Sequence, residues 1–376
     1  MKHLMARILI AALAAVPLFG GYGYVSSVTF AGATGSTQTN ITLLFRFGDP
    51  NLKTAANGGQ IQNLCSRNGT SVPCDFIFTN DSTCTIITGG YKWGFDGDYS
   101  ATAGTGHGWV MIPSYTTSGV TPTVCIGNSA ISTYQGGAVG AEFDSNTILA
   151  LHLANGTTLS LTDFSSTGNT TTNTNGSIAT TGKIDGGVSF AAASQQYLTI
   201  NAASSAWNPT SFTAEEWFNS TTDLNILRRD DGTTRAWLIN LGSGSVSCLL
   251  IFGSFPGVTS AAATYADGNW HHAAITVSAT GGISTITLYV DGVLQGSAST
   301  AGTNPVASSL IRIAGLPNFG SWYSGNADNT VYSTTVRSAN WIATEYGNQN
   351  SPPAIGQFTG SRGIQVVGTT VGAAVY

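Results

Sequence analysis

The sequence has very little charge. Asp, Glu, Lys and Arg make up 8% of the 376 residues, whereas an average soluble protein has about 25%. Only four lysines occur, the net charge is −5, and the basic residues are scattered, which excludes a nucleic-acid-binding surface. Hydrophobic residues still make up 42% of the chain, so we expect a folded protein rather than a disordered one.

So little charge needs a physical reason. Soluble β proteins usually keep apart through surface charge, and they protect exposed strand edges with lysine in particular. Two reasons stay open. Either the edges and faces of this protein are covered, by other copies of itself or by attached sugar, or the protein is secreted into acid or high salt, where charge helps less.

The chain also lacks an apolar run long enough to span a membrane. The run from Ile8 to Phe19 follows Lys2 and Arg7 and precedes two glycines, which is the order of a secretory signal peptide. We therefore expect residues 1–21 to be a signal peptide. We expect no integral membrane span in the rest of the chain, and an extracellular location or one on a cell or virion surface.

Cysteine is scarce, and no C-x-x-C pair indicates a zinc site. Cys65 and Cys74 flank a short polar loop and are close enough to form a disulfide. Cys84 and Cys125 are the candidates for a second disulfide in the same part of the chain. Cys248 is then left over in an apolar run, and we expect a buried thiol there.

Helical periodicity is nearly absent. Short β-branched and aromatic runs alternate with Gly, Asn, Ser and Asp clusters, which is typical of an all-β protein. We expect a small N-terminal β-sandwich over residues 22–145, a second β domain over 146–350 and a glycine-rich tail over 351–376. The tail carries a strand-like segment, 363–376, with no evident partner, so it is a candidate for exchange with a neighbouring subunit.

Local signals predict two hairpins and one helix in the second domain. Residues 211–218 and 224–230 bracket a polar turn, and pairing about that turn would place Glu216 opposite Arg228 and Glu215 opposite Arg229. Asp291-Gly292, between the apolar runs 283–290 and 293–298, predicts a two-residue turn. Residues 338–349 predict a helix, with Ser338 as N-cap and Trp341, Ile342 and Tyr346 as its apolar stripe.

Several motifs in this second domain resemble one family. They are GKIDGGVSF (182–190), QYLTI (196–200), SFTAEEW (211–217), DGNWHHAAITV (267–277), TLYVDGVLQGS (287–297) and the closing stretch 327–352. Together they are similar to the laminin-G-like branch of the concanavalin-A-like jelly rolls. The upstream stretches 51–63, 75–84 and 127–133 resemble a small β domain of unknown function that often precedes such domains in secreted bacterial, archaeal and phage proteins.

The resemblance implies a jelly roll of two antiparallel sheets that binds glycans or proteins, in some members with Ca²⁺. The family's acidic pair at the start of its closing strand is Asp328-Asn329 here, so one carboxylate is lost. Ca²⁺ needs six to eight oxygen ligands, and the sequence assembles no such cluster. Asp328 is thus the one metal-ligand candidate, and we expect no cofactor.

Catalysis has little support in the sequence. Related jelly-roll hydrolases need two carboxylates facing each other across a cleft, but the four glutamates, Glu142, Glu215, Glu216 and Glu345, do not stand in that arrangement. Neighbouring Glu215 and Glu216 would point to opposite faces of a strand. The same holds for His271 and His272, and the family resemblance implies that they belong to a structural strand with Trp270 in the core. We expect no enzyme, and glycoside hydrolysis stays a remote alternative.

The best candidates for ligand contact are Asn318, Trp322 and Tyr323 in the loop 317–326, because aromatic rings can stack on sugars. The alternative is that Trp322 or Tyr323 points inward and belongs to the core.

Two functions remain. The first is a self-associating, non-enzymatic subunit of an extracellular fibre, sheath or virion surface, supported by the low charge and the spare tail. The second is a secreted or phage-borne adhesin that binds a glycan, supported by the family resemblance.

Overall fold

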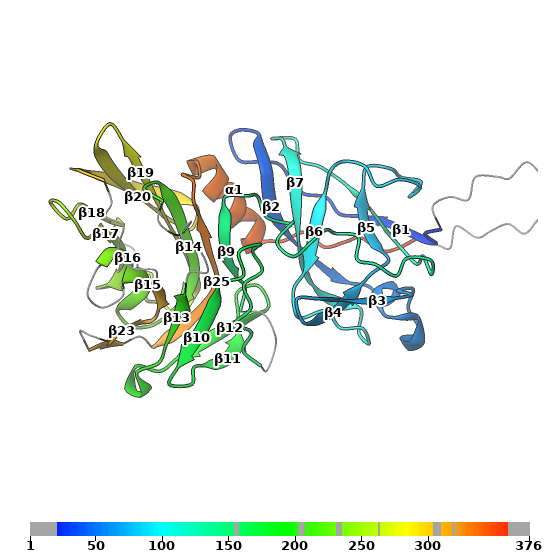
Figure 1. The fold of residues 1–376 in the computed structure, drawn as a ribbon, viewed down its shortest axis with the longest axis horizontal. Helices are drawn as coiled ribbons and strands as arrows, with labels where there is room; N and C mark the ends of the chain where they lie inside the picture. Colours follow the sequence, from blue (N-terminus) through cyan, green and yellow to red (C-terminus); the bar gives the residue numbers. More distant parts are fainter. Residues whose placement is uncertain are drawn as a thin grey trace, which may run out of the picture.

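The computed structural model describes residues 21–359, except for 154–157, 202–206, 208, 231–234, 262–263, 304–309, 318–319 and 323. Within these residues the chain forms antiparallel sheets and a single α-helix. Figure 1 shows two β lobes side by side along the long axis. The all-β prediction, a small sandwich followed by a concanavalin-A-like jelly roll, is confirmed. The predicted signal peptide, 1–21, lies outside the described residues but for Gly21.

The N-terminal lobe consists of two three-stranded sheets, β1–β8–β5 and β2–β7–β6, and a hairpin, β3–β4. Its strands and 3-10 turns are β1 (Tyr24–Ser27), β2 (Gln38–Gly48), η1 (Pro50–Leu52), η2 (Ala55–Asn57), β3 (Leu64–Arg67), β4 (Thr70–Pro73), β5 (Phe76–Thr79), β6 (Lys92–Phe95), β7 (Thr105–Tyr115) and β8 (Thr123–Ile126). The boundary predicted between residues 145 and 146 follows β8 and stays a prediction.

Aromatic side chains fill the space between these two sheets. The Phe45 ring of β2 lies 5.0 Å from Phe78 and 6.2 Å from Phe76, both on β5 of the opposite sheet. Two disulfides reinforce the lobe, one between Cys65 and Cys74 and one between Cys84 and Cys125. Cys248 is a buried free thiol in the other lobe.

The C-terminal lobe is a sandwich of two large sheets, and a short hairpin is attached to it. The front sheet has the strand order β10 (Thr170–Thr174), β13 (Tyr197–Asn201), β22 (Leu310–Ile313), β15 (Leu224–Asp230), β16 (Arg235–Gly242), β17 (Ser245–Leu250) and β18 (Gly257–Thr259). The back sheet has the order β11 (Ile178–Thr181), β12 (Gly186–Phe190), β25 (Gly325–Ser333), β14 (Phe212–Asn219), β19 (Trp270–Thr280), β20 (Ile283–Val290) and β21 (Val293–Ala301), with β9 (Thr147–Leu151) also paired to β25. The hairpin is β23 (Gly315–Leu316) with β24 (Ser321–Trp322), and η3 (Ala192–Ser194) precedes β13.

Every second residue of these strands faces the space between the two sheets. Leu198 and Ile200 from the front sheet and Ile275 and Val277 from the back sheet are buried in one apolar core. The turn between β20 and β21 is the two-residue one that its sequence predicts, since Asp291 and Gly292 both have positive φ angles, 51° and 73°. This backbone conformation matches the twist of a hairpin and suits Asp-Gly.

The hairpin predicted from residues 211–218 and 224–230 is wrong. Strand β14 pairs with β19 and β25 in the back sheet, whereas β15 pairs with β16 and β22 in the front sheet. The connection after Asn219 crosses the sandwich, so Glu215 is paired with Ala274 and not with Arg229, and Glu216 with Ala273 and not with Arg228. Pairing to distant strands outweighs the local match of charges.

The helix α1 (Ala339–Asn350) lies at the seam between the lobes (Figure 1). Ser338 is its N-cap as predicted, and its Oγ accepts from Trp341 N at 3.1 Å. Trp341 and Ile342 are buried in the core of the N-terminal lobe together with Ala274 and Tyr289 from the outer face of the back sheet. The α1 helix therefore joins the jelly roll to the first lobe through a shared apolar core.

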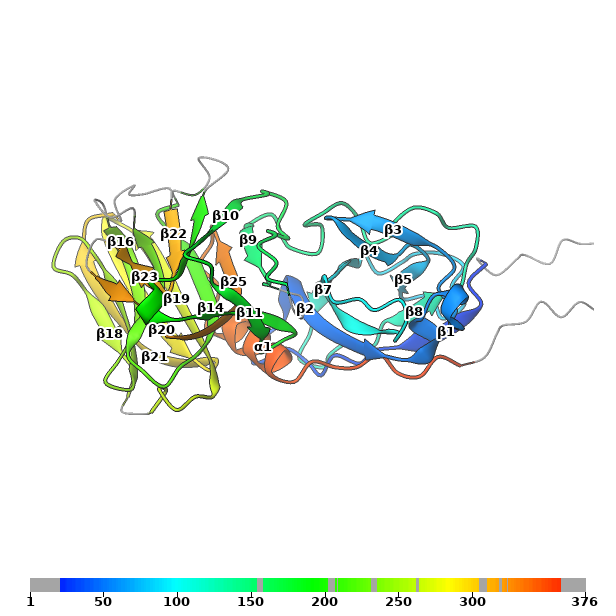
Figure 2. The ribbon, with the colours of Figure 1, turned by 90° about the horizontal axis from the view of Figure 1, so that it is seen from below.

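After α1, residues 351–359 return along the N-terminal lobe (Figure 2). Ile355 N donates to Arg46 O at 2.9 Å, Gly356 N to Ser27 O at 2.8 Å, and Thr359 N to Val25 O at 3.0 Å. Ile355 and Phe358 add their side chains to the N-terminal core. This part of the predicted tail, here called the strap, is thus paired within its own chain, while 363–376 lies outside the described residues.

Among the described residues, no helix has the length and the apolar character that crossing a membrane would require.

Candidate functional site

The outer face of the front sheet carries a row of side chains that lie opposite the core. Because Ile311 and Ile313 are in the core, Arg312 between them faces outward. Arg312 is paired with Thr199 on one neighbouring strand and with Arg228 on the other. Arg228 is in turn paired with Leu238, and Leu238 with Leu249. The row thus combines a hydroxyl, two guanidinium groups and two apolar side chains.

A second row on this face is polar throughout. Asn225 is paired with Asn240, Asn240 with Ser247, and Ser247 with Thr259. Arg228 Nη1 donates to Asn225 Oδ1 at 2.8 Å, which connects the two rows. Asn240 Oδ1 is buried and accepts no hydrogen bond from any described residue. A buried acceptor of this kind calls for a partner from a ligand or from water.

Trp322 lies beside these rows. It is half-buried, belongs to neither apolar core, and its ring centroid is 6.0 Å from that of Tyr197 on β13. Strand β24, which carries Trp322, lies against β15. The pair gives this face an aromatic surface. The other two predicted contacts, Asn318 and Tyr323, lie outside the described residues.

The second candidate is a group of acidic and histidine side chains at the seam between the lobes. Asp98 and His107 come from the turn and strand after β6, and Asp185 comes from the turn before β12. One carboxylate oxygen from each Asp and one ring nitrogen of His107 all lie within 4.8 Å of one another. His107 Nδ1 and Asp98 Oδ2 are 2.7 Å apart, and His107 N donates to Asp98 Oδ1.

Two further aspartates extend this group inward. Asp96 is fully buried, accepts from Trp109 Nε1 at 2.8 Å, and lies 2.5 Å from His152 Nδ1. Asp328, on β25, is also fully buried, and its Oδ2 accepts from the backbone N–H groups of Lys183 and Ile184. The seam cluster, defined as Asp96, Asp98, His107, His152, Asp185 and Asp328, therefore draws on both lobes.

The surroundings of the seam cluster disfavour the ionised form of its carboxylates. Burial, followed by the negative charges of Asp96, Asp328 and Asp98, raises the pKa of Asp185 to about 10. Burial likewise raises the pKa of Asp328 to about 7, against the opposing effect of the two backbone N–H groups. Carboxylates of this kind need protons or a bound cation as compensation.

The residues present fit a divalent cation. Asp328, the metal-ligand candidate from the sequence, offers a buried oxygen, and Asp98, Asp185 and His107 add two further carboxylates and an imidazole. Carboxylates suit Ca²⁺, but Ca²⁺ takes oxygen ligands only, whereas an imidazole suits transition metals. The sequence indicated Asp328 alone, because the other ligands come from segments far apart in the chain.

The remaining glutamates and histidines form structural contacts. Adjacent Glu215 and Glu216 face opposite sides of β14 as predicted, since Glu215 is paired with Ala274, which belongs to the core of the N-terminal lobe, and Glu216 with Ala273, which belongs to the jelly-roll core. His271 bridges Asp267 and Asp291, with N–O distances of 3.2 Å and 2.8 Å.

His272 and Trp270 are the neighbours of His271 on strand β19. His272 Nε2 lies 3.4 Å from Glu215 Oε2, and burial lowers the pKa of His272 to about 4, so its ring is neutral. The expectation that Trp270 packs in the core is wrong. It starts strand β19 opposite Asn219, is half-buried, and belongs to neither core.

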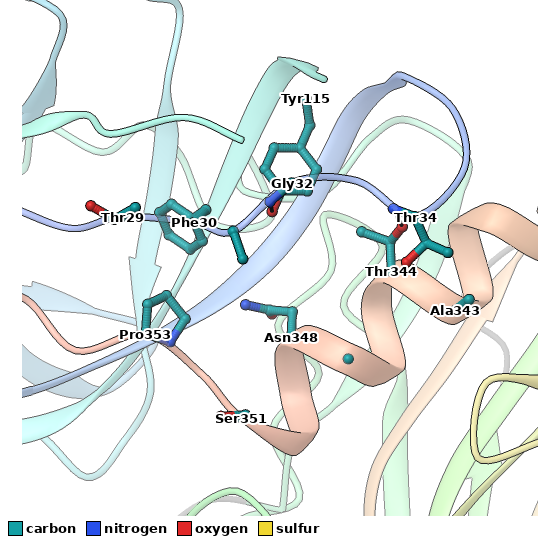
Figure 3. Close-up of a pocket in the computed structure, with 12 residues that line it drawn as sticks. Thr29, Phe30, Gly32, Thr34, Tyr115, Ala343, Thr344, Asn348, Ser351 and Pro353 are labelled. Atoms are coloured by element: carbon teal, nitrogen blue, oxygen red, sulfur yellow. Dashed lines mark hydrogen bonds between the residues drawn. The ribbon is translucent and has the colours of Figure 1, made fainter. Parts of the chain in front are cut away.

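A cavity of about 360 Å³ lies between residues 29–34 and α1 (Figure 3). Its lining carries no charged side chain. The polar groups there hold the helix to the N-terminal lobe: Thr34 N donates to Thr344 Oγ1 at 2.9 Å, and the Asn348 side-chain amide pairs with both backbone groups of Leu44. This cavity belongs to the packing of the seam.

Comparison with known proteins identifies one part of the chain. Residues 192–343 match the model of a family described as the concanavalin A-like lectin/glucanases superfamily. None of the curated proteins matches.

The solved structures that match this chain include two binding domains and a botulinum neurotoxin type C structure. The botulinum neurotoxin serotype D binding domain is 13% identical, with 54% of this chain and 52% of that chain covered and a TM-score of 0.42. The binding domain of Paraclostridial Mosquitocidal Protein 1 is 13% identical over 54% and 52%, with a TM-score of 0.43. A structure of botulinum neurotoxin type C, whose cell entry depends on interaction with two ganglioside molecules, is 12% identical over 54% and 51%, with a TM-score of 0.44.

The chain thus spans about half the length of each of these chains. The family match and the two packed antiparallel sheets agree with the resemblance read from the sequence motifs. Residues 192–343 therefore form a domain of the concanavalin A-like lectin/glucanase superfamily.

Proposed function

We propose that this protein binds a carbohydrate on the outer face of its front sheet and performs no catalysis there. The observation that carries the proposal is the Tyr197–Trp322 ring pair beside a row of amide and hydroxyl groups. Ring faces stack on the C–H groups of a sugar, while amides and hydroxyls both donate and accept hydrogen bonds. The buried acceptor Asn240 Oδ1 lies in that row.

The arrangement supports recognition of hydroxyl groups. Sugar hydroxyls can pair with the side chains of Asn240, Ser247 and Thr199, which are half-buried and uncharged. Arg312 and Arg228 lie between these groups in the register. Only 1% of Arg228 and 9% of Arg312 is exposed, so these side chains hold their polar neighbours in place, as Arg228 does through Asn225.

Glycan-array binding of the purified chain, without its residues 1–20, tests this proposal. We expect the wild-type protein to bind a defined subset of glycans, and Trp322→Ala and Asn240→Ala each to weaken that binding at least tenfold. Tyr24→Ala, which removes a half-buried aromatic ring from β1 in the other lobe, is the matched control and should bind as the wild type. No binding by the wild type, or equal binding by all variants, would overturn the proposal.

Self-association is the second candidate, and one observation favours it. Strand β21 is the last strand in the order of the back sheet, contains no charged residue, and exposes 61% of Val293 and 54% of Leu294. Uncharged outer strands with exposed apolar side chains favour pairing with another chain. Light scattering tests this. Growth of assemblies with concentration supports it, whereas a monodisperse monomer at high concentration contradicts it. Extracellular placement is part of both proposals.

A further inference from the structure

The seam cluster gathers more negative charge than the described residues around it balance. Its four aspartates face two histidines, while Lys183 directs its Nζ to Asn350 Oδ1 at 2.7 Å. Arg46, which also lies near the cluster, has an exposed side chain. Two of the four aspartates, Asp96 and Asp328, are fully buried. Isolated carboxylates are costly to bury in a protein interior unless a cation or a proton compensates them.

Three buried atoms in the seam cluster have no hydrogen-bond partner among the described residues. They are Asp185 Oδ2, Asp328 Oδ1 and His152 Nε2. Asp328 Oδ2 is held by the backbone N–H groups of Lys183 and Ile184, directly before Asp185, so the Asp328 carboxylate lies beneath the turn that carries Asp185. Unsatisfied buried polar atoms are rare in folded proteins, and a bound ion is one way in which such atoms are satisfied.

We infer that Asp98 and His107 of the N-terminal lobe and Asp185 of the C-terminal lobe bind one divalent cation, with the buried carboxylate of Asp328 as a fourth ligand. The three ligand atoms within 4.8 Å of one another have the spacing that a shared ion requires. His107 Nδ1 is 2.7 Å from Asp98 Oδ2, so these two atoms already lie next to each other, as two ligands of one cation would.

The donor set selects among divalent cations. An imidazole nitrogen with two or three carboxylates fits Mn²⁺ or Zn²⁺, whereas Ca²⁺ would have to use the carboxylates and leave His107 aside. We therefore expect Mn²⁺ or Zn²⁺ to bind more tightly than Ca²⁺. This inference does not depend on carbohydrate binding, because the seam cluster and the front sheet share no residue.

The cation would connect the lobes directly. Asp98 lies in the turn between β6 and β7, and Asp185 lies in the turn before β12, so a shared ion joins two segments that belong to different sandwiches. The family match covers residues 192–343, so Asp98, His107 and Asp185 lie outside it. The ion would thus act together with α1 and the strap in fixing the two lobes relative to each other.

The experiment uses the full described chain, stripped with a chelator and then titrated separately with Mn²⁺, Zn²⁺ and Ca²⁺. Isothermal calorimetry should give one ion per chain, and thermal unfolding should shift upward with the ion and return with the chelator. Mn²⁺ binding can also be read by paramagnetic resonance. A wild-type chain that binds none of the three ions at millimolar concentration overturns the inference.

Variants of Asp98 and Asp185 test whether both lobes contribute ligands to the cation. Asp98→Asn and Asp185→Asn should each weaken binding at least tenfold. The control, Asp267→Asn, removes a carboxylate from the other His–Asp group, Asp267–His271–Asp291, and should bind as the wild type. Unchanged affinity in Asp98→Asn, with loss in Asp185→Asn, would show a site within the jelly roll alone and overturn the bridging ion. The chelator-dependent melting of the wild type decides the case if a variant fails to fold.

Discussion

The two lobes reach stability by different routes. The jelly roll encloses its core between two large sheets, and its one described cysteine is a free thiol. The N-terminal lobe has two three-stranded sheets, both disulfides, and a core completed by Ala274, Trp341, Ile355 and Phe358 from later parts of the chain. A small domain buries a smaller share of its surface and needs such additions. The comparison teaches that the core of the first lobe depends on later parts of the chain, while the main core of the jelly roll consists of the jelly roll's own residues.

Removal of the strap should cause the largest loss of stability in the N-terminal lobe. A chain ending at residue 350 loses Ile355 and Phe358 from the N-terminal core and the backbone hydrogen bonds to Arg46, Ser27 and Val25. Loss of two buried side chains of this size costs roughly 5 kcal/mol or more. We expect hydrogen exchange to show an N-terminal lobe that opens while the jelly roll stays protected. A chain ending at residue 360 is the control, and equal protection in both chains would contradict the asymmetry.

Removal of a disulfide should cause the second-largest loss in the free energy of unfolding. Cys84 and Cys125 are 41 residues apart, and the loop-entropy argument gives about 4 kcal/mol for that bond, against about 2.5 kcal/mol for Cys65–Cys74, which closes only 9 residues. Paired Ala substitutions at each bond, followed by denaturant unfolding under non-reducing conditions, measure the two values. A larger loss from the short loop would show that strain or residual structure decides instead.

The smallest predicted effect concerns pH and the Glu345 side chain on α1. Burial raises the pKa of Glu345 to about 7, while Arg337 and the hydrogen bond from Trp341 Nε1 oppose the rise. Glu215 on β14 also faces it, and its pKa is raised by burial and by Glu345. Because the folded state holds the proton more tightly than the unfolded state, stability falls as pH rises from about 4.3 to about 7.

Glu345→Gln should therefore be more stable than the wild type by about 1–3 kcal/mol at pH 8 and similar to it at pH 4. The amide can still accept from Trp341, so packing is retained. Urea unfolding at the two pH values measures the difference. An unchanged pH dependence in the variant would mean that the carboxyl group is compensated in the folded state.

Local features were predictable from the sequence, and long-range pairing was not. Asp291-Gly292 and Ser338 specify a turn and a helix cap through neighbouring residues alone, and both occur as predicted. The β14 and β15 segments also looked like a hairpin, but the deciding contacts of β14 are with Ala274 and Val331, which are distant in sequence.

The same limit applies to the candidate sites. Trp322 was recognisable as an aromatic residue in a polar loop, but its neighbour Tyr197 is 125 residues earlier in the numbering. Asp98 lies in a glycine-rich turn that carries no metal-binding signature, and it becomes a ligand candidate only because Asp185 reaches it from the other lobe. The proximity of Asp98 and Asp185 cannot be read from a single sequence.

The pairing of the strap with β1 also has a mechanical consequence. Ser27 faces Gly356 and Val25 faces Thr359, so the two segments run antiparallel, and β1 lies at the end of the N-terminal lobe away from the jelly roll (Figure 1). A pulling force that separates β1 from the strap would load these hydrogen bonds one at a time, so they would open in sequence. Until the last of them parts, the jelly roll would carry no tension.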